Sequence, residues 1–163
     1  MEIEILAKLK QIPFFDKIKE NREYMSLLRG IIGVKKVSKG ATIIREGELG
    51  SEMYILYSGS VEIRKRTRAG DDYTVIIERA ENNISFGEMA LIDDERRSAT
   101  VIATDDSTLL VITKKDFLAL GDSHPMICLP ITRAISSILA SRLRKTTQDM
   151  LTIFDALVNE IKD

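Results

Sequence analysis

The sequence predicts an α+β fold in which an antiparallel β-roll, of the jelly-roll or double-stranded β-helix type, lies between N-terminal helices and a long C-terminal dimerisation helix. Three observations lead to this prediction. Apolar residues recur at helical spacing from Glu2 to about Ile32, short β-branched runs separated by glycines fill the middle of the chain, and the segment after Ser123 contains no glycine.

The N-terminal segment predicts short helices. Ile5, Leu9, Leu27 and Ile31 belong to runs with helical spacing, and Pro13 interrupts the pattern. We therefore expect at least two helices before the roll.

The middle segment, from Lys39 to about Thr113, predicts strands. Its β-branched and aromatic runs are separated by turn glycines, among them Gly47, Gly50 and Gly59. Because no long helical pattern lies between the runs, an antiparallel sandwich or barrel is favoured over a parallel α/β sheet.

The last segment predicts one long helix that starts near Pro125, with Ser123 placed to cap it. We place a boundary here: residues 1–123 form the N-terminal helices and the roll, and residues 124–163 form a C-terminal lid and dimerisation helix. An apolar stripe with alternating spacings of four and three follows the helix, as in a coiled-coil seam: Leu139, Leu143, Thr146, Met150, Ile153 and Leu157.

This stripe has two explanations, because it can pack on the chain's own roll or against a second copy of the helix. A tail of roughly 50 Å, at about 1.5 Å per residue, is long for the first role. The length favours a homodimer formed through the C-terminal helix.

Composition excludes several classes of protein. The 163 residues, 44% hydrophobic, suffice for one core, and 24 basic against 25 acidic residues leave no excess charge for binding nucleic acid. The single cysteine, Cys128, and the lack of an apolar leader predict a cytoplasmic protein. Charges interrupt the apolar runs, so we expect no membrane contact.

The stretch Ile84–Ala103, "ISFGEMALIDDERRSATVIA", carries the candidate site. Gly87 permits close approach of the backbone, and the "GEMALI" segment can form one or two helical turns whose first N–H groups bind an anion. Arg97 supplies a planar guanidinium suited to a phosphate, and Glu88 can accept a hydrogen bond from a sugar hydroxyl. A ribose phosphate fits both groups.

These residues resemble a known family. "FGEMAL" followed by "RRSATV" is similar to the phosphate-binding cassette of cyclic nucleotide-binding domains, and "KGATIIREGELGSEMYILYSGSVEIRK" is similar to the opening strands of that family. The resemblance covers roughly residues 10–150.

The resemblance implies roles for individual positions of the cassette Phe86–Val101. Glu88 matches the acid that binds the ribose 2′-hydroxyl, and Arg97 matches the arginine paired with the cyclic phosphate. The other matching positions surround the sugar-phosphate: Phe86, Gly87, Met89, Ala90, Ser98 and Ala99.

The C-terminal helix resembles the dimerising helix of catabolite-activator-type regulators, in which Thr146 and Thr147 fall on positions that contact the base. Those regulators continue into a helix-turn-helix domain of about 60 to 80 residues. This chain stops at Asp163, so we do not expect DNA binding.

The resemblance implies a regulatory cyclic nucleotide sensor without cofactor, metal or enzyme activity, which signals to an unknown downstream protein. Cyclic AMP is the favoured ligand and cyclic GMP the alternative, since the hydroxyl of Ser98 can also serve a guanine. The acids of the turn, Asp93, Asp94 and Glu95, could compete for Arg97, but we expect a solvated turn in which Arg96 offsets them. The rival hypothesis is an adaptor that keeps the fold and the dimer helix with a degenerate pocket.

Overall fold

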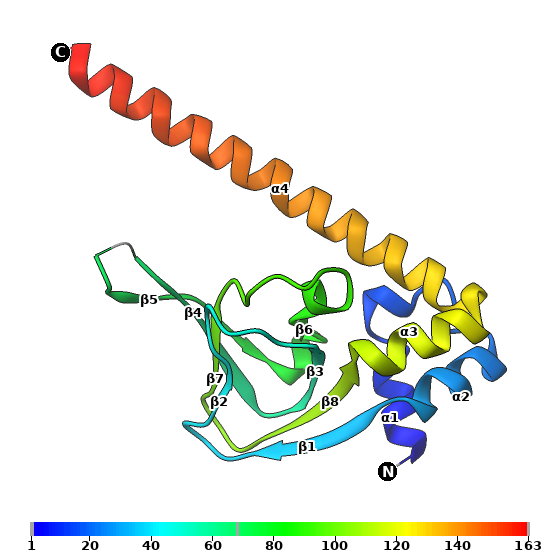
Figure 1. Cartoon of the computed structure of the whole chain (residues 1–163). Helices are drawn as coiled ribbons and strands as arrows, with labels where there is room; N and C mark the ends of the chain where they lie inside the picture. The colour runs from blue at the N-terminus through cyan, green and yellow to red at the C-terminus, as the bar shows by residue number, and fades with distance from the viewer. Residues whose placement is uncertain (1, 68, 163) are drawn as a thin grey trace.

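The computed structural model of the chain describes residues 2–67 and 69–162, so the predicted domain ends at Met1 and Asp163 lie outside the described residues (Figure 1). The elements follow in this order: α1 (Glu2–Leu9), η1 (Pro13–Phe15), α2 (Arg22–Gly30), β1 (Gly33–Val37), β2 (Thr42–Ile44), β3 (Glu52–Ser58), β4 (Ser60–Arg66), β5 (Asp72–Arg79), η2 (Ala80–Asn82), β6 (Ser85–Phe86), η3 (Glu88–Leu91), β7 (Thr100–Ala103), β8 (Ser107–Thr113), α3 (Lys114–Ser123) and α4 (Pro125–Lys162).

The strands form two antiparallel sheets of four strands, in the orders β1-β8-β3-β6 and β2-β7-β4-β5. β4 and β5 form a hairpin with Ile63 opposite Ile76, and β5 is the edge strand of its sheet. The predicted α+β fold with an antiparallel roll is confirmed, although the roll is not closed.

Two apolar clusters hold the molecule together, and strand alternation separates them. In β3, Tyr54 and Leu56 face the interior of the roll, whereas Met53 and Ile55 pack in the cluster that contains the helices. All four of these side chains are at most 3% exposed. The roll and the helical layer therefore share the sheet that contains β3.

The N-terminal helices follow the prediction closely. α1 ends at Leu9, and Pro13 begins the 3₁₀ turn η1, which agrees with the predicted interruption. Strands begin at Gly33, somewhat before the predicted change of character near Lys39.

The prediction that Ser123 caps the last helix is wrong. The helix α3 already begins at Lys114, where the Thr113 side chain accepts a hydrogen bond from the Asp116 N–H. Ser123 is the last residue of α3, and its hydroxyl donates back to the carbonyl of Ala119 at 2.9 Å. Pro125 does begin α4, as its preset φ favours.

The long helix α4 has two different halves, and its outer half projects away from the roll (Figure 1). In the inner half, Ile127, Ile131 and Ile135 are at most 1% exposed and belong to the helical core. In the outer half, Leu143 is 68% exposed and Ile153 is 62% exposed. Beyond Leu139, the predicted stripe does not pack on the chain's own roll.

One 18-residue window of α4 has a mean hydropathy of 1.3, and 22% of it is buried, which makes α4 a weak candidate for a membrane span by length and composition. Ile127 and Ile131 are buried in the domain core, so packing inside the protein accounts for their apolar character.

Candidate functional site

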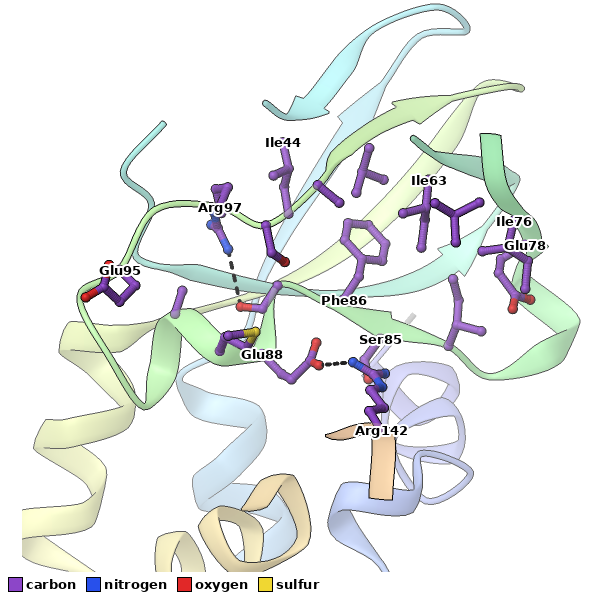
Figure 2. Close-up of a pocket in the computed structure, with 18 of the residues that line it drawn as sticks. Ile44, Ile63, Ile76, Glu78, Ser85, Phe86, Glu88, Glu95, Arg97 and Arg142 are labelled. Carbon is purple, nitrogen blue, oxygen red and sulfur yellow. Dashed lines mark hydrogen bonds and ion pairs between the residues drawn. The ribbon is translucent and has the colours of Figure 1, made fainter. Parts of the chain in front are cut away.

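A cavity of about 540 Å³ lies between the roll and the middle of α4 (Figure 2). Its apolar wall comes from β2, β4, β5, β6 and β7, and its charged groups come from β5, η3, the segment before β7, and α4. The apolar lining includes Ile44, Ile63, Val75, Ile76, Ile84, Phe86 and Val101. The cavity thus combines an apolar wall with a small number of convergent polar groups, as ligand sites commonly do.

Arg97 is held by the loop between β2 and β3. Its backbone N–H donates to the Glu48 carbonyl at 2.9 Å, and its carbonyl accepts from the Gly47 N–H at 2.9 Å. Its guanidinium donates to the Glu52 carbonyl at 2.8 Å and to the Gly87 carbonyl at 3.3 Å. The side chain is only 8% exposed, so it is fixed before any ligand arrives.

Two glycines make room for this arginine. A Cβ atom at position 50 would lie 2.2 Å from Arg97 Nε, and one at position 87 would lie 2.7 Å from Nη1. Gly87 also has a φ of 75°, a conformation that other residues rarely adopt. Both positions therefore require glycine as long as Arg97 keeps this place.

The charge of Arg97 is not neutralised by a close carboxylate. Glu52 Oε2 lies 4.0 Å from Nη2, and the closer partners are neutral carbonyl groups. A guanidinium with this environment retains the ability to pair with an anion in the cavity.

Among the described residues, the acids of the turn 92–96 form no ion pair with Arg97. Asp94, Glu95 and Arg96 are exposed, which agrees with the expected solvated turn. Arg96 does not offset the acids as expected, because its guanidinium donates to the Gly47 carbonyl at 2.7 Å. Lys114 takes that role by pairing with Asp94 at 2.8 Å.

Glu88 is buried, with 3% of its surface exposed, at the start of η3. The segment is a single 3₁₀ turn, at the short end of the one or two turns expected. Glu88 Oε1 accepts a hydrogen bond from Arg142 Nη1 at 2.5 Å, and Figure 2 shows this pair reaching across the cavity from η3 to α4. A buried carboxylate needs such a partner or a polar ligand.

The structure brings most of the predicted site residues together. The lining contains eight of them: Phe86, Gly87, Glu88, Met89, Ala90, Arg97, Ser98 and Ala99. Thr146 and Thr147 do not line this cavity; they are exposed on α4, and the Thr147 hydroxyl donates to the Leu143 carbonyl at 3.0 Å. The two residues of α4 that do line the cavity are Arg142 and Lys145.

Arg142 is the main functional candidate that sequence reasoning missed. It lies in the segment 124–163 that we predicted to form a lid and dimerisation helix, but nothing in that segment indicates which residue faces the roll. Its partner Glu88 is 54 residues away in the chain. Only the packing of α4 against the roll reveals the contact.

The floor of the cavity is stiffened by aromatic packing. Phe86 stacks on Tyr54 with ring centroids 5.5 Å apart. Burial raises the pKa of Tyr54 to about 12, and a hydrogen bond to the Glu52 carboxylate adds to the shift. Tyr54 therefore stays neutral in this apolar floor at physiological pH.

Metal chemistry finds no ligand set in the part of the chain that the structure describes. Within residues 2–67 and 69–162, no three His, Cys, Asp or Glu side chains are grouped so that they could hold a metal ion.

The comparison with known proteins agrees with this geometry. The family described as "Cyclic nucleotide-binding domain" matches residues 34–124, which include the whole cassette. The chain belongs to this family.

Individual relatives of the family differ in the rest of their chains. The cyclic AMP receptor protein of Thermus thermophilus is 30% identical over 124 residues, which cover 76% of this chain and 55% of that protein. The human cGMP-dependent protein kinase 2 is 42% identical over 85 residues, covering 52% of this chain and 11% of the kinase. The chain therefore spans about half the length of the first relative and a small part of the second.

A solved structure of the family has the same arrangement of elements. The crystal structure of the Thermus thermophilus catabolite activator protein has a TM-score of 0.74 and 28% sequence identity, over 85% of this chain and 61% of that one. The fold and the family of the cyclic nucleotide-binding domain are thus established by independent comparisons.

Proposed function

We propose that this cyclic nucleotide-binding domain is a sensor whose preferred ligand is cyclic AMP. One observation carries the proposal: a fixed arginine without a close carboxylate, Arg97, and a buried glutamate, Glu88, face the same 540 Å³ cavity. A cyclic nucleotide has a phosphate for the first group and a ribose hydroxyl for the second.

The phosphate would bind at Arg97. Its guanidinium offers a planar pair of donors for two phosphate oxygens, and the start of η3 offers an N–H group at Met89. Ser98 and Ala99 line the cavity beside the arginine, where the hydroxyl and the backbone can add further contacts.

The ribose would bind at Glu88. The 2′-hydroxyl would donate to this carboxylate, which Arg142 already contacts from α4. The ligand would then join η3 and α4 through one shared acceptor. Ligand binding on the roll would therefore affect the contact between Glu88 and α4.

The base would extend from the ribose toward α4. Thr146 lies one turn beyond Arg142 on the helix, and Lys145 already lines the cavity. We expect Thr146 and Thr147 to cover the base when the helix is drawn over the ligand. Cyclic AMP is preferred in this proposal, and the hydroxyl of Ser98 is the group that would instead favour a guanine.

A second candidate function is an adaptor that binds no nucleotide. One observation favours it: Arg142 occupies the Glu88 carboxylate at 2.5 Å, so the ribose acceptor already has a partner. In the adaptor, this ion pair would close the cavity permanently.

The sensor would act as a homodimer through α4. The exposed stripe includes Leu143, Met150, Ile153 and Leu157, with exposures between 52% and 68%. Apolar side chains in register along a helix are covered in a coiled coil by a second helix. The dimer would pass the ligand signal to a protein partner, since no residue set for catalysis is visible in the described cavity.

Calorimetric titration with cyclic AMP and cyclic GMP tests this function. The sensor predicts saturable binding of cyclic AMP in a ratio of one ligand per chain. Tenfold tighter binding of cyclic GMP would reverse the choice of base. An absence of heat and of thermal stabilisation at millimolar concentrations of both ligands would establish the adaptor instead.

A further inference from the structure

Glu46 lies outside the cavity lining, in the loop 45–51 that connects β2 to β3. This loop surrounds Arg97: Gly47 and Glu48 bond both backbone groups of the arginine, and Gly50 leaves space for its guanidinium. The position of the loop therefore sets the position of the arginine.

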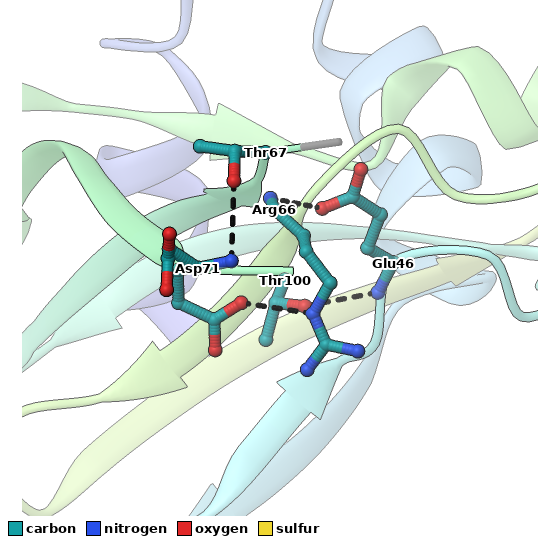
Figure 3. Close-up of polar contacts among 6 residues, drawn as sticks. Glu46, Arg66, Thr67, Asp71 and Thr100 are labelled. Atoms are coloured by element: carbon teal, nitrogen blue, oxygen red, sulfur yellow. Dashed lines mark hydrogen bonds and ion pairs between the residues drawn. The ribbon is translucent and has the colours of Figure 1, made fainter. Parts of the chain in front are cut away.

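Glu46 is attached at both its backbone and its side chain (Figure 3). Its backbone N–H donates to the Thr100 hydroxyl at 3.0 Å, which fixes the loop to the start of β7. Its carboxylate accepts a hydrogen bond from the backbone N–H of Arg66 at 3.0 Å. A hydrogen bond to a charged acceptor is among the stronger ones in proteins.

The backbone N–H of Arg66 needs a side-chain acceptor because Arg66 lies beyond the end of the β4–β7 pairing. β4 pairs with β7 only as far as Arg64 opposite Thr100, whereas its pairing with β5 continues to Arg66 opposite Asp72. Beyond Arg64, the Glu46 carboxylate takes over as the acceptor that a strand would otherwise supply. Glu46 thus extends the sheet by one bond.

This bond joins the loop around Arg97 to the β4–β5 hairpin, which forms another part of the cavity wall. On one side, the loop positions Arg97; on the other, the β4–β5 hairpin supplies Val75, Ile76 and Glu78 to the lining. The turn of the hairpin is closed separately, because the Asp71 N–H donates to the Thr67 hydroxyl at 3.1 Å and Arg66 Nε donates to Asp72 at 3.1 Å. Loss of the Glu46 side chain would therefore remove the direct bond between the hairpin and the loop, while the turn of the hairpin and the pairing of β4 with β7 remain.

We propose that Glu46 is a positioning residue for the nucleotide, which sets the distance between the Arg97 guanidinium and the hairpin wall of the cavity. The inference rests on the proposed function, because it assigns Glu46 a role toward that ligand. Glu46 acts through Arg97 and the hairpin and does not touch the ligand.

The conservative variant separates this role from a general loss of stability. Glu46→Gln keeps a carbonyl oxygen that can accept the Arg66 N–H, whereas Glu46→Ala removes the acceptor. We expect Glu46→Ala to weaken binding of cyclic AMP about three- to tenfold, as for the loss of one hydrogen bond. Glu46→Gln should bind within twofold of the wild type.

Arg45→Ala is the matched control, because Arg45 lies in the same loop, outside the cavity lining, and its side chain is 63% exposed and pairs with the equally exposed Glu48. It should bind within twofold of the wild type. Amide exchange of Arg66, measured by NMR without ligand, should accelerate in Glu46→Ala and stay slow in Glu46→Gln and Arg45→Ala.

A double-mutant cycle tests whether Glu46 acts through the arginine. In an Arg97→Lys background, Glu46→Ala should lose less than twofold further affinity, since coupled residues give non-additive losses. Additive losses, or wild-type affinity in Glu46→Ala, would overturn the positioning role alone. A wild type that binds neither cyclic nucleotide would overturn the proposed function as well.

Discussion

The two sides of the cavity differ in how completely the chain has built them. On the roll, Arg97 and Glu88 have side chains that are 8% and 4% exposed, and hydrogen bonds hold both. On α4, Arg142 is 60% exposed, and the outer half of the helix projects away from the roll (Figure 1). The roll side is buried and held by hydrogen bonds, whereas the helix side is exposed.

This difference separates the part of the cavity that favours affinity for the ligand from the part that can change position on binding. Groups that are already fixed bind without further ordering, so they favour affinity. An exposed helix is freer to change position, and a ligand shifts it only if it binds one position more tightly than the other. The roll is therefore suited to recognise the nucleotide, and α4 is suited to report it.

The largest expected effect is on the helix side. Ile153→Asp would place a charge in the apolar stripe of each chain, and an unpaired buried charge costs about 3–5 kcal/mol. We expect the variant to be monomeric by sedimentation at tens of micromolar and to bind cyclic AMP more weakly than the wild type; Leu143→Asp should behave alike. In the wild type, ligand should increase the protection of residues 131–161 from hydrogen exchange.

The control for this experiment is Thr152→Asp, which adds the same charge at an exposed position next to the stripe. It should remain dimeric. A wild type that is already monomeric, or unchanged exchange in α4 on saturation with ligand, would contradict a dimer coupled to the cavity.

The second effect is on the roll side. Arg97→Lys replaces a planar pair of donors by a single ammonium group, and we expect a loss of about 1.5–3 kcal/mol in binding, or about 10- to 150-fold, with the fold retained. Calorimetry measures the affinity, and thermal unfolding checks the fold. Arg45→Lys, at an exposed position outside the cavity lining, should bind within twofold. Equal affinities for both variants would remove Arg97 from the site.

A smaller effect is expected where the two sides meet. Glu88→Gln keeps an acceptor for the ribose hydroxyl but removes its charge, so we expect a loss of roughly 1 kcal/mol, about fivefold. A 2′-deoxy analogue should then lose less affinity than it loses with the wild type, because both changes weaken the same contact. Independent, fully additive losses would show that the hydroxyl binds elsewhere.

The smallest effect concerns the inner half of α4, where burial raises the pKa of the Cys128 thiol to about 11. In the unfolded chain a thiol titrates near pH 8.5, so its contribution to stability is complete below that pH and is lost as pH rises through about 11. We expect slow alkylation of Cys128 at pH 8 with or without ligand. Rapid alkylation would mean that the inner half leaves the core; Ser141→Cys, at an exposed position, supplies the fast reference.

Much of the candidate site could be predicted because it is local in the chain. Phe86 to Ala90 and Arg97 to Ala99 form one side of the cavity from a single stretch of 14 residues, and their spacing already indicates a turn, an anion site and a strand. The roll was equally predictable, since strand alternation and turn glycines act between near neighbours.

The parts that could not be predicted depend on residues far apart in the chain. Ser123 has the chemistry of a helix cap, but α3 extends to it and the hydroxyl turns back to Ala119. Glu46 gives no local sign that it completes a sheet 20 residues later at Arg66.

By itself, the sequence determined the fold class and the apolar stripe of α4 through short-range periodicity and residue type, and it indicated the cassette through resemblance to a known family. Tertiary structure alone decided which face of α4 meets the roll: Arg142 and Lys145 reach the cavity, whereas Thr146 and Thr147 do not. The physical reason is that successive residues of an α-helix point about 100° apart. The sequence shows that a helix is present, and only its packing sets which of these directions faces the ligand.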